Sequence, residues 1–264
     1  MRSADVTFVI LTKDEAQRIG DCLASLPAGA PALVYDAESS DATPDIARRL
    51  GARVVSQPWA GFVAARENAA ALVQTPWTFM LDADERLTPQ LRAELAALEP
   101  PERTVAYSVP RRNIFCGRWM RGAGWWPDRL IRLFRTGQAT PVARGPQSGA
   151  LLHETWRARG VWGELRSPLE HRSYDTPAHY RRKFAAYTDI EAGSGPASLR
   201  RTMAHWLLVP LRAAWLLGPK LGLRDGWRGA FIAFGSAAYP AVAATKAWRR
   251  RRRPTIRVQK SARG

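Results

Sequence analysis

The stretch "WTFMLDADERL", residues 77–87, changes abruptly from apolar to acidic side chains. Its first part, residues 77–81, is short and mostly apolar, which predicts a buried strand. Asp82, Asp84 and Glu85 follow directly, so three acids fall within four positions. On extended backbone Asp82 and Asp84 point to the same side, and the small residue between them points away. The stretch therefore predicts a strand that ends in a pair of carboxylates.

The rest of the first hundred residues alternates between strands and helices. Apolar and β-branched runs predict strands at 6–11, 32–36, 53–57 and 77–81, and helical spacing predicts helices at 14–26, 43–50, 63–74 and 88–98. Thr43-Pro44 and Thr88-Pro89 each place a capping hydroxyl before a proline, which is typical of a helix start. Short strands that alternate with helices indicate βαβ units, so we expect an α/β fold with a mostly parallel sheet.

Polar residues follow three of these strands where each strand ends. They are Thr12, Lys13, Asp14 and Glu15 after the first, Asp36, Glu38, Ser39, Ser40 and Asp41 after the second, and Asp82, Asp84 and Glu85 after the fourth. Ligands of parallel α/β sheets bind beyond the carboxyl ends of the strands. Crowded carboxylates repel each other unless a cation lies between them, and Mg²⁺ or Mn²⁺ keeps positions open for substrate phosphates. We therefore expect Asp82 and Asp84 to bind such an ion; a solvated turn is the alternative.

The chain is strongly basic, and its excess of positive charge is uneven. The formal net charge is +17, and residues 246–264 contain nine basic residues and no acid, including the run Arg249–Arg253. An anionic partner is therefore expected: phosphate esters, an acidic membrane surface or nucleic acid. Cys22 and Cys116 have neither metal-ligand nor disulfide spacing, which suits a reducing cytoplasm. The apolar run 6–11 is too short for a signal peptide, so we expect a cytoplasmic protein.

The C-terminal third is apolar but interrupted. Residues 204–223 and 229–248 are broken by prolines and cations, and the longest uncharged run, 229–245, falls slightly short of the roughly 20 residues of a spanning helix. With its tryptophans and the arginine run behind it, this region predicts helices that lie in a membrane interface and are attracted to anionic lipids. An ordinary helical subdomain and a re-entrant or spanning hairpin are the alternatives. The predicted domains are residues 1–195, 196–248 and, as a basic tail, 249–264.

Motifs of a known family run through nearly the whole chain. They are "VTFVILTKDEAQRI", "VYDAESSDAT", "WAGF" and "MLDADERL", followed by "VPRRNIFCGRWMRGAGWWPDRLIRLFR", "LLHE" and "LRDGWRGAFIAFGSAAY". These motifs resemble those of the family 2 glycosyltransferases, and most closely those of the lipopolysaccharide core-biosynthesis glucosyltransferases. The resemblance implies the GT-A fold, which is Rossmann-like, and an inverting transfer of a sugar from a nucleotide diphosphate donor.

The resemblance also implies where the nucleotide binds. Thr12 and Glu15 would border it, Asp36 would contact the base, and Asp41 would close the same loop. The family usually has Asp-Ser-Gly-Ser-Thr-Asp-Gly-Thr after the second strand, whereas this chain has "DAESSDAT". Both glycines are replaced, the first by Glu38, which removes easy access to positive φ and puts the path of the loop in question.

The metal and the diphosphate would lie at the fourth strand. By the resemblance, Asp82 would lie against the ribose and the metal, and Asp84 would bind the metal directly. Arg66, two residues before the asparagine of the third helix, would contact the diphosphate. His153 in "LLHE" would bind metal or phosphate, or would be a structural histidine.

Inverting transfer needs a general base that removes a proton from the acceptor hydroxyl as it attacks the anomeric carbon. Glu154 in "LLHE" and Asp128 in "GWWPD" are the candidates, with Glu154 preferred, and Asp128 could equally pair with neighbouring arginines. A cluster of aromatic and basic residues would bind a phosphorylated sugar acceptor by stacking and bidentate hydrogen bonds, or would pack as core with a solvated edge. It comprises Trp119, Trp125, Trp126, Arg111, Arg112, Arg118 and Arg121.

The resulting hypothesis is a cytoplasmic glycosyltransferase associated peripherally with the inner membrane. It would move a hexose, with glucose preferred, from a UDP-sugar to a lipid-linked, phosphorylated oligosaccharide such as the lipopolysaccharide inner core. The alternative enzyme is a glycosyltransferase of another envelope or exopolysaccharide pathway. A nucleotidylyltransferase is disfavoured, because "LTKDEAQR" has no glycine after the first strand. The non-enzyme alternative is a nucleic-acid or membrane binding module built on the basic tail, and the clustered carboxylates, which repel phosphates, argue against nucleic acid as a partner.

Overall fold

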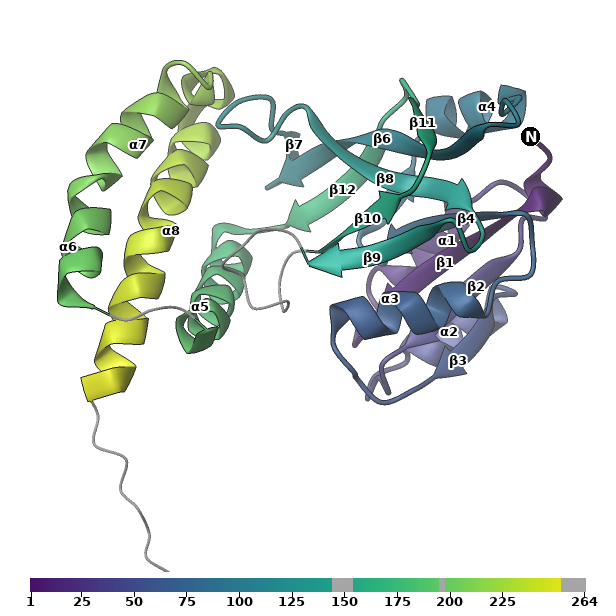
Figure 1. The fold of residues 1–264 in the computed structure, drawn as a ribbon, viewed down its shortest axis with the longest axis horizontal. Coiled ribbons are helices and arrows are strands. Elements are labelled where there is room, and N and C mark those ends of the chain that lie inside the picture. The colour runs from purple at the N-terminus through teal and green to yellow at the C-terminus, as the bar shows by residue number, and fades with distance from the viewer. Residues whose placement is uncertain (144–153, 195–197, 253–264) are drawn as a thin grey trace, which may run out of the picture.

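A large mixed sheet forms one side of the molecule, and a layer of helices forms the other (Figure 1). The computed structural model describes residues 1–143, 154–194 and 198–252. The large sheet has the strand order β3-β2-β1-β4-β8-β6-β12-β5, with β7 and β11 paired to β6. The predicted α/β architecture is therefore confirmed.

The N-terminal half of the sheet is parallel. β1 (Val6–Thr12) lies between β2 (Ala32–Asp36) and β4 (Trp77–Asp82), and β3 (Arg53–Ser56) pairs with β2. The helices that connect these strands are α1 (Ile19–Ala24), α2 (Thr43–Arg49) and α3 (Phe62–Ala71), and α4 (Pro89–Ala97) follows β4 and β5. Because β1 and β4 are neighbours, the polar residues that follow them meet at one edge.

Two predicted helix starts differ from the structure. α1 begins at residue 19 and not at 14, because Asp14 has a φ of 53° and its carboxylate accepts a hydrogen bond from Ser40 N at 2.7 Å. Thr43 is the first residue of α2 and does not cap it; its Oγ1 accepts a hydrogen bond from Glu15 N at 2.8 Å. Thr88 does cap α4, as predicted, since its Oγ1 accepts from Leu91 N at 3.2 Å.

The second half of the sheet mixes strand directions. Its strands are β5 (Glu85–Leu87), β6 (Thr104–Phe115), β7 (Arg118–Trp119), β8 (Asp128–Arg135), β11 (Val161–Glu164) and β12 (Leu169–Tyr174). β8 is antiparallel to both β4 and β6, and β12 is parallel to β6. β9 (Ala139–Ala143) and β10 (Glu154–Ala158) form a separate antiparallel pair. This half places residues of β6, β8 and β12 opposite the ends of β1 and β4.

Alternating side chains fill a core on each face of the sheet. In β1, Phe8 and Ile10 join one cluster, and Val9 between them joins the other. Phe79 and Met80 divide in the same way in β4. Central strands covered on both faces need apolar side chains at successive positions, which explains the continuous apolar runs of the sequence.

The helical layer consists of α5 (Pro177–Ser194), α6 (Leu199–Leu207), α7 (Val209–Leu217), the short 3₁₀ helix η2 (Gly222–Asp225) and α8 (Gly226–Arg252). A second short 3₁₀ helix, η1 (Ser3–Asp5), precedes β1. α8 packs against α5, α6 and α7, and it continues past the predicted boundary at residue 248. A third core cluster, which includes Phe115, Tyr180 and Ile232, joins the layer to the end of β6. Among the described residues, no helix has both the length and the apolar character to span a membrane.

Candidate active site

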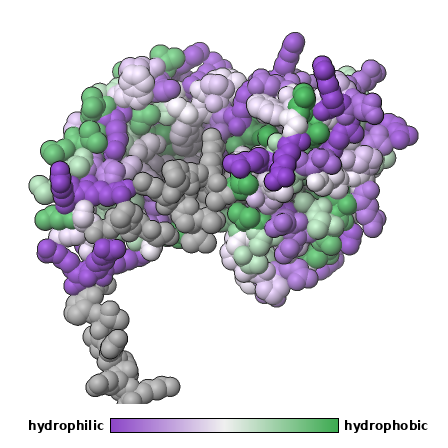
Figure 2. Space-filling model, in the orientation of Figure 1, coloured by the Kyte–Doolittle hydropathy of each residue, from purple (hydrophilic) through white to green (hydrophobic). Residues whose placement is uncertain are grey.

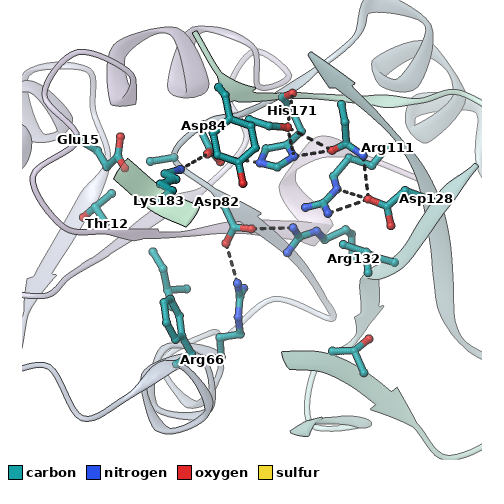
Figure 3. A pocket seen from close by; sticks show the side chains of 18 of the residues that line it. Thr12, Glu15, Arg66, Asp82, Asp84, Arg111, Asp128, Arg132, His171 and Lys183 are labelled. Carbon is teal, nitrogen blue, oxygen red and sulfur yellow. Dashed lines mark hydrogen bonds and ion pairs between the residues drawn. The ribbon is translucent and has the colours of Figure 1, made fainter. Parts of the chain in front are cut away.

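A cavity of about 1100 Å³ opens at the carboxyl ends of β1 and β4. The chain after β1 contributes Thr12 and Glu15, and the end of β4 contributes Asp82 and Asp84. The opposite wall comes from β6, β8, β12 and α5 (Figure 3). Its polar residues are Arg111, Asn113, Asp128, Arg132, His171, Ser173, Lys183 and Tyr187. Of the acids predicted to converge, Glu15, Asp82 and Asp84 line the cavity, where they face a wall with several cations, whereas those that follow β2 do not line it.

Asp82 is held between two buried arginines. Its Oδ1 accepts a hydrogen bond from Arg66 Nη2 at 2.7 Å, and its Oδ2 accepts one from Arg132 Nη2 at 2.8 Å (Figure 3). Burial raises the pKa of Asp82, but the two guanidinium groups outweigh it and bring the pKa well below its usual range. The chain itself thus supplies cations to both oxygens of this carboxylate.

Glu85, the third acid of the opening stretch, is fully buried and anchors this arrangement. Its Oε2 accepts the backbone N–H of Asp82 at 3.0 Å, and its Oε1 accepts from Arg132 Nη2 at 2.5 Å and Arg111 Nη1 at 3.2 Å. Glu85 was expected among the acids at the sheet edge, and Arg132 was expected only among the arginines that could pair with Asp128; the structure pairs it with Asp82 and Glu85 instead. The signal was the arginine within the apolar run "RLIRLFR", since an arginine in a buried strand needs an acidic partner.

Asp84 faces the cavity with different partners. Its Oδ2 lies 3.4 Å from His171 Nε2 and 3.9 Å from Lys183 Nζ (Figure 3). Burial raises the pKa of Asp84, and the opposing effect of His171 prevails, so the pKa lies below its usual value. Asp82 and Asp84 therefore have separate cationic neighbours and do not share one.

The ring of His171 is oriented by Asn113. Asn113 Nδ2 donates to Asp128 Oδ2 at 3.1 Å and to the carbonyl of Trp125 at 3.3 Å, so its Oδ1 is the atom that faces His171 Nδ1 at 2.6 Å. An amide oxygen only accepts, so Nδ1 carries a proton and Nε2 is turned toward Asp84. His171 was not among the predicted site residues, because a single histidine in "LEHRSY" has no ligand spacing.

The donor atoms near Asp84 fit a divalent cation. His171 Nε2 and Asp84 Oδ2 are a nitrogen and an oxygen donor that one cation would contact together, and Asn113 fixes the orientation of the ring. Asp82 fits less well, since both of its oxygens accept from arginines. Within the described residues, no group of three or more His, Cys, Asp or Glu side chains is placed to hold a metal. His153 lies outside the described residues.

Asp128 lies at the start of β8 and lines the cavity. Its Oδ2 accepts from Arg111 Nε at 2.9 Å and Nη2 at 2.7 Å, as well as from Asn113. In the described part of the chain, no hydrogen bond reaches its Oδ1. Burial raises the pKa of Asp128, but Arg111 outweighs it, so the pKa is lowered and the group is ionised at neutral pH. Asp128 does pair with an arginine, but with Arg111 and not with the adjacent Arg129 and Arg132 of the prediction. Arg129 pairs with Glu164, and Arg132 pairs with Asp82 and Glu85. The structure describes Glu154 by its backbone, at the start of β10, next to the cavity-lining Thr155.

The loop after β2 is braced from within. Asp36 is 1% exposed, and its carboxylate accepts from Thr12 Oγ1 at 2.9 Å and from Ser39 N at 2.9 Å. Glu38 adopts positive φ (54°) without a glycine, and its carbonyl accepts from Lys13 Nζ at 2.6 Å. This bracing explains how the loop keeps its turn after the loss of both glycines.

Of two further predicted residues, Glu15 lines the cavity and Asp41 does not. Asp41 does not line the cavity; its carboxylate accepts from Ala16 N at 3.0 Å and Thr43 N at 2.9 Å, so it ties the loop to the chain after β1. Glu15 lines the cavity beside Arg18, and burial raises its pKa.

The cluster of tryptophans and arginines is divided by the pleat of β6. Arg111 and Trp125 line the cavity. Arg112, the next residue of β6, stacks over the ring of Trp119 at 4.7 Å, and Arg121 lies over the same ring at 4.2 Å. Arg112, Trp119 and Arg121 are not among the lining residues. The expectation of one acceptor surface built from the whole cluster is therefore met only in part, because neighbouring strand residues face opposite sides.

The model of glycosyl transferase family 2 matches residues 7–153 of the chain. A lipopolysaccharide core biosynthesis glycosyltransferase, LpsC, of Rhizobium meliloti (strain 1021) is 30% identical over 142 residues, which cover 50% of this chain and 50% of that protein. A protein of Rickettsia bellii (strain RML369-C), named an uncharacterized glycosyltransferase, is 36% identical over 108 residues, 39% of this chain and 37% of that protein. The chain thus spans half or less of the length of these relatives.

The fold also has a counterpart among solved structures. The mannosyltransferase PcManGT from Pyrobaculum calidifontis, solved in complex with GDP-Man and Mn²⁺, superposes with a TM-score of 0.52 at 14% sequence identity, over 92% of this chain and 86% of that one. At this identity the likeness establishes the fold, including the arrangement of β1, β4 and the helical layer beyond the matched family region.

Proposed function

The chain belongs to glycosyl transferase family 2, and we propose that it transfers a hexose, with inversion, from a UDP-sugar to a lipid-linked, phosphorylated oligosaccharide. The observation that carries this proposal is the cavity at the ends of β1 and β4, where Asp84 and His171 lie beside the cations of the opposite wall. Glucose is the preferred donor sugar, and the inner core of lipopolysaccharide is the preferred acceptor. The relative named for lipopolysaccharide core biosynthesis supports the acceptor class.

The donor would bind along the β1–β4 edge. Thr12 and Glu15 would border the nucleoside, with Asp36 and Asp41 holding the loop beneath it. Trp59 and Phe62, whose rings meet edge to face at 4.7 Å on the cavity wall, offer an apolar surface for the base. Arg66 and Arg132 would hold Asp82 against the ribose, within reach of the diphosphate. Lys183 would add a positive charge near the sugar.

A divalent cation, Mg²⁺ or Mn²⁺, would be held by Asp84 and His171, with remaining positions taken by the substrate and water. When bound, it would supply positive charge to the leaving diphosphate. His171 Nε2 and Asp84 Oδ2 are the atoms available for it, while Asn113 fixes the ring. Because a nitrogen ligand favours transition metals, we expect Mn²⁺ to support transfer at lower concentration than Mg²⁺.

Asp128 is the general base that we propose in preference to Glu154. Its ionised carboxylate lines the cavity, and Arg111 and Asn113 fix its orientation through Oδ2. Oδ1 would accept the proton of the acceptor hydroxyl while the hydroxyl oxygen bonds to the anomeric carbon. The bond between that carbon and the diphosphate oxygen breaks, and UDP leaves with the bonding electrons. Glu154 is the alternative base, and a different envelope glycan is the alternative acceptor.

The chain would work at the cytoplasmic face of the inner membrane, since its acceptor is anchored in lipid. The test is release of UDP from a panel of UDP-sugars in the presence of Mn²⁺ or Mg²⁺. We expect UDP-glucose to be cleaved in a metal-dependent way, and Asp84→Asn to lower the rate at least about a hundredfold. Asp21→Asn is the matched control, because Asp21 pairs with Arg86 at the surface away from the cavity. Full activity of Asp84→Asn would refute the metal role, and no cleavage of any UDP-sugar would refute the donor.

A further inference from the structure

The outer side of α6, α7 and η2 exposes large apolar side chains in an unbroken series. Leu207 is 79% exposed, and Leu211 and Leu223 are each 67% exposed. Leu199, Met203, Trp206, Leu208, Trp215, Leu221 and Trp227 are each at least 41% exposed. Figure 2 shows apolar side chains along the edge of the molecule that α6 and α7 occupy in Figure 1. We call this surface the outer face.

The same helices bury small residues on their inner side. α6 buries Thr202 and α7 buries Ala213, and the buried residues of α8 are Gly229, Ile232, Ala233, Ala237, Ala241, Ala243 and Ala247. The backbones approach closely where η2 crosses α8: a Cβ on Gly229 would lie 1.8 Å from the carbonyl oxygen of Gly222. Large apolar side chains pack inward at one end of the layer, where Leu216, Leu217 and Ile232 belong to the third core cluster. Along α6 and the middle of α8 the buried contacts are small, and the large side chains of α6 and of the first turns of α7 point outward.

The charge of the outer face is of one sign. Residues 199–224 contain Arg200, Arg201, Arg212, Lys220 and Arg224, and no aspartate or glutamate. At the end of α8, Arg249 to Arg252 are also exposed. Apolar side chains rimmed by cations are the pattern of helices that lie in the headgroup region of an anionic bilayer.

We infer that the outer face docks onto an anionic lipid bilayer, with α6 and α7 lying in the plane of its interface. Helices of nine residues each are too short to cross a membrane, and in a lipid surrounding large apolar side chains face outward and small ones face neighbouring helices. A second copy is a poorer occupant. A two-fold dimer would bring together two copies of a surface that carries positive charge and no acid.

The inference deepens the proposed function and rests on it for its purpose, because it names the surface that would bring the cavity to a lipid-linked acceptor. α8 lies between the outer face and α5 (Figure 1). α5 in turn contributes Lys183 and Tyr187 to the cavity wall. The docked helices are thus joined through α8 to the wall where an acceptor would enter.

The test is co-sedimentation of the full chain with vesicles of equal parts phosphatidylglycerol and phosphatidylcholine. We expect the wild type to sediment with these vesicles and only weakly with pure phosphatidylcholine, and Leu207→Glu/Leu211→Glu to bind at least about tenfold more weakly. Glutamate keeps the helices, since it is a good helix former. The matched control is Leu50→Glu/Val161→Glu, which changes two exposed apolar residues outside the outer face. Leu50 is 54% exposed at the end of α2, and Val161 is 53% exposed in β11. Met203→Gln/Leu207→Gln should weaken binding without adding charge.

Three results would overturn the inference. They are a wild type that stays in solution, a Leu207→Glu/Leu211→Glu variant that sediments like the wild type, and a wild-type dimer that this variant dissociates without any vesicle binding. Thermal unfolding and metal-dependent cleavage of UDP-sugar without vesicles report whether the variant is folded. Vesicle binding without cleavage of any UDP-sugar would refute the proposed function alone, and cleavage without vesicle binding would refute the docking alone.

Discussion

The sheet and the helical layer differ in which apolar side chains they bury. In the sheet, Phe8, Phe79 and Leu133 are buried to 1% exposure or less. In the helical layer, α8 buries Ala237 and Ala241 to the same degree, and Ile232 at one end, whereas most leucines and tryptophans of α6 and α7 lie on the outer face. Burial in water favours large apolar side chains inside, because the gain in free energy grows with the apolar area removed from water. One chain therefore combines a part organised for water with a part whose outer face is organised for lipid.

The difference also separates two tasks. The acids, arginines and histidine of the cavity come from the sheet, from the chain that follows β1 and β4, and from α3, and α5, which packs on α8, adds Lys183. None of the large residues of the outer face lines the cavity. If the comparison is right, chemistry and docking are lost through different substitutions.

The largest expected effect is the loss of transfer in Asp128→Asn. An asparagine keeps the shape of the side chain but cannot take the acceptor's proton, so the rate of transfer should fall about 10²–10⁴-fold. Vesicle binding should not change, since the substitution leaves the outer face untouched. UDP release without acceptor should fall less than transfer, since a carboxamide oxygen can still accept from Asn113, which orients His171 beside Asp84. The measurement is transfer to a soluble acceptor with matched vesicle sedimentation.

Glu154→Gln is the companion to that variant. If Glu154→Gln loses transfer while Asp128→Asn keeps it, the proton goes to the carboxylate beside His153, and Asp128 serves mainly to pair with Arg111. Equal loss of transfer and vesicle binding in either variant would contradict the separation of the two regions.

The parallel half of the sheet was predictable because each of its strands is marked by its own composition. The runs at residues 6–11 and 77–81 are buried on both faces, so every position is apolar or β-branched, and the acids mark where the strands end. Their convergence followed from the parallel direction alone. The positions of Asp82 and Asp84 at the end of a strand were therefore predictable from the local sequence alone.

The opposite wall was not predictable in the same way. His171 and Lys183 reach the cavity from β12 and α5, and it is the pairing of β12 with β5 and β6, with His171 opposite Glu85, that brings His171 to Asp84. No local pattern in the sequence encodes that pairing. The sequence also did not predict which side of α6 and α7 faces the neighbouring helices, because an apolar run such as "AHWLLVPLRAAWLL" has large side chains on every side.

A pair of leucine substitutions tests the packing directly. Leu91 in α4 is fully buried in the core of the sheet, and Leu91→Ala should lower the free energy of unfolding by about 2–5 kcal/mol through the cavity that it leaves. Leu207→Ala on the outer face should change the free energy of unfolding by less than about 0.5 kcal/mol in the absence of lipid. Chemical denaturation of both variants measures the difference. If Leu207→Ala lowered the free energy of unfolding in water by as much as Leu91→Ala does, Leu207 would be buried within the protein, which would contradict its 79% exposure.

A smaller effect tests the inner side of the layer. Gly229→Ala adds a methyl group that would lie 1.8 Å from the carbonyl oxygen of Gly222, and forcing η2 away from α8 should lower the free energy of unfolding by about 1–3 kcal/mol. Gly193→Ala in α5 is the matched control, because its added methyl would lie 3.6 Å from its nearest neighbour, a side-chain atom of Arg250. There the gain in helix propensity should stabilise the protein by about 0.5–1 kcal/mol. The two Gly→Ala substitutions should thus change the free energy of unfolding in opposite directions. If Gly229→Ala is as stable as Gly193→Ala, the helices do not depend on backbone contact. Close packing of the helices would then not explain why the leucines and tryptophans of the outer face are exposed. The packing of the helices would no longer support a lipid-facing layer.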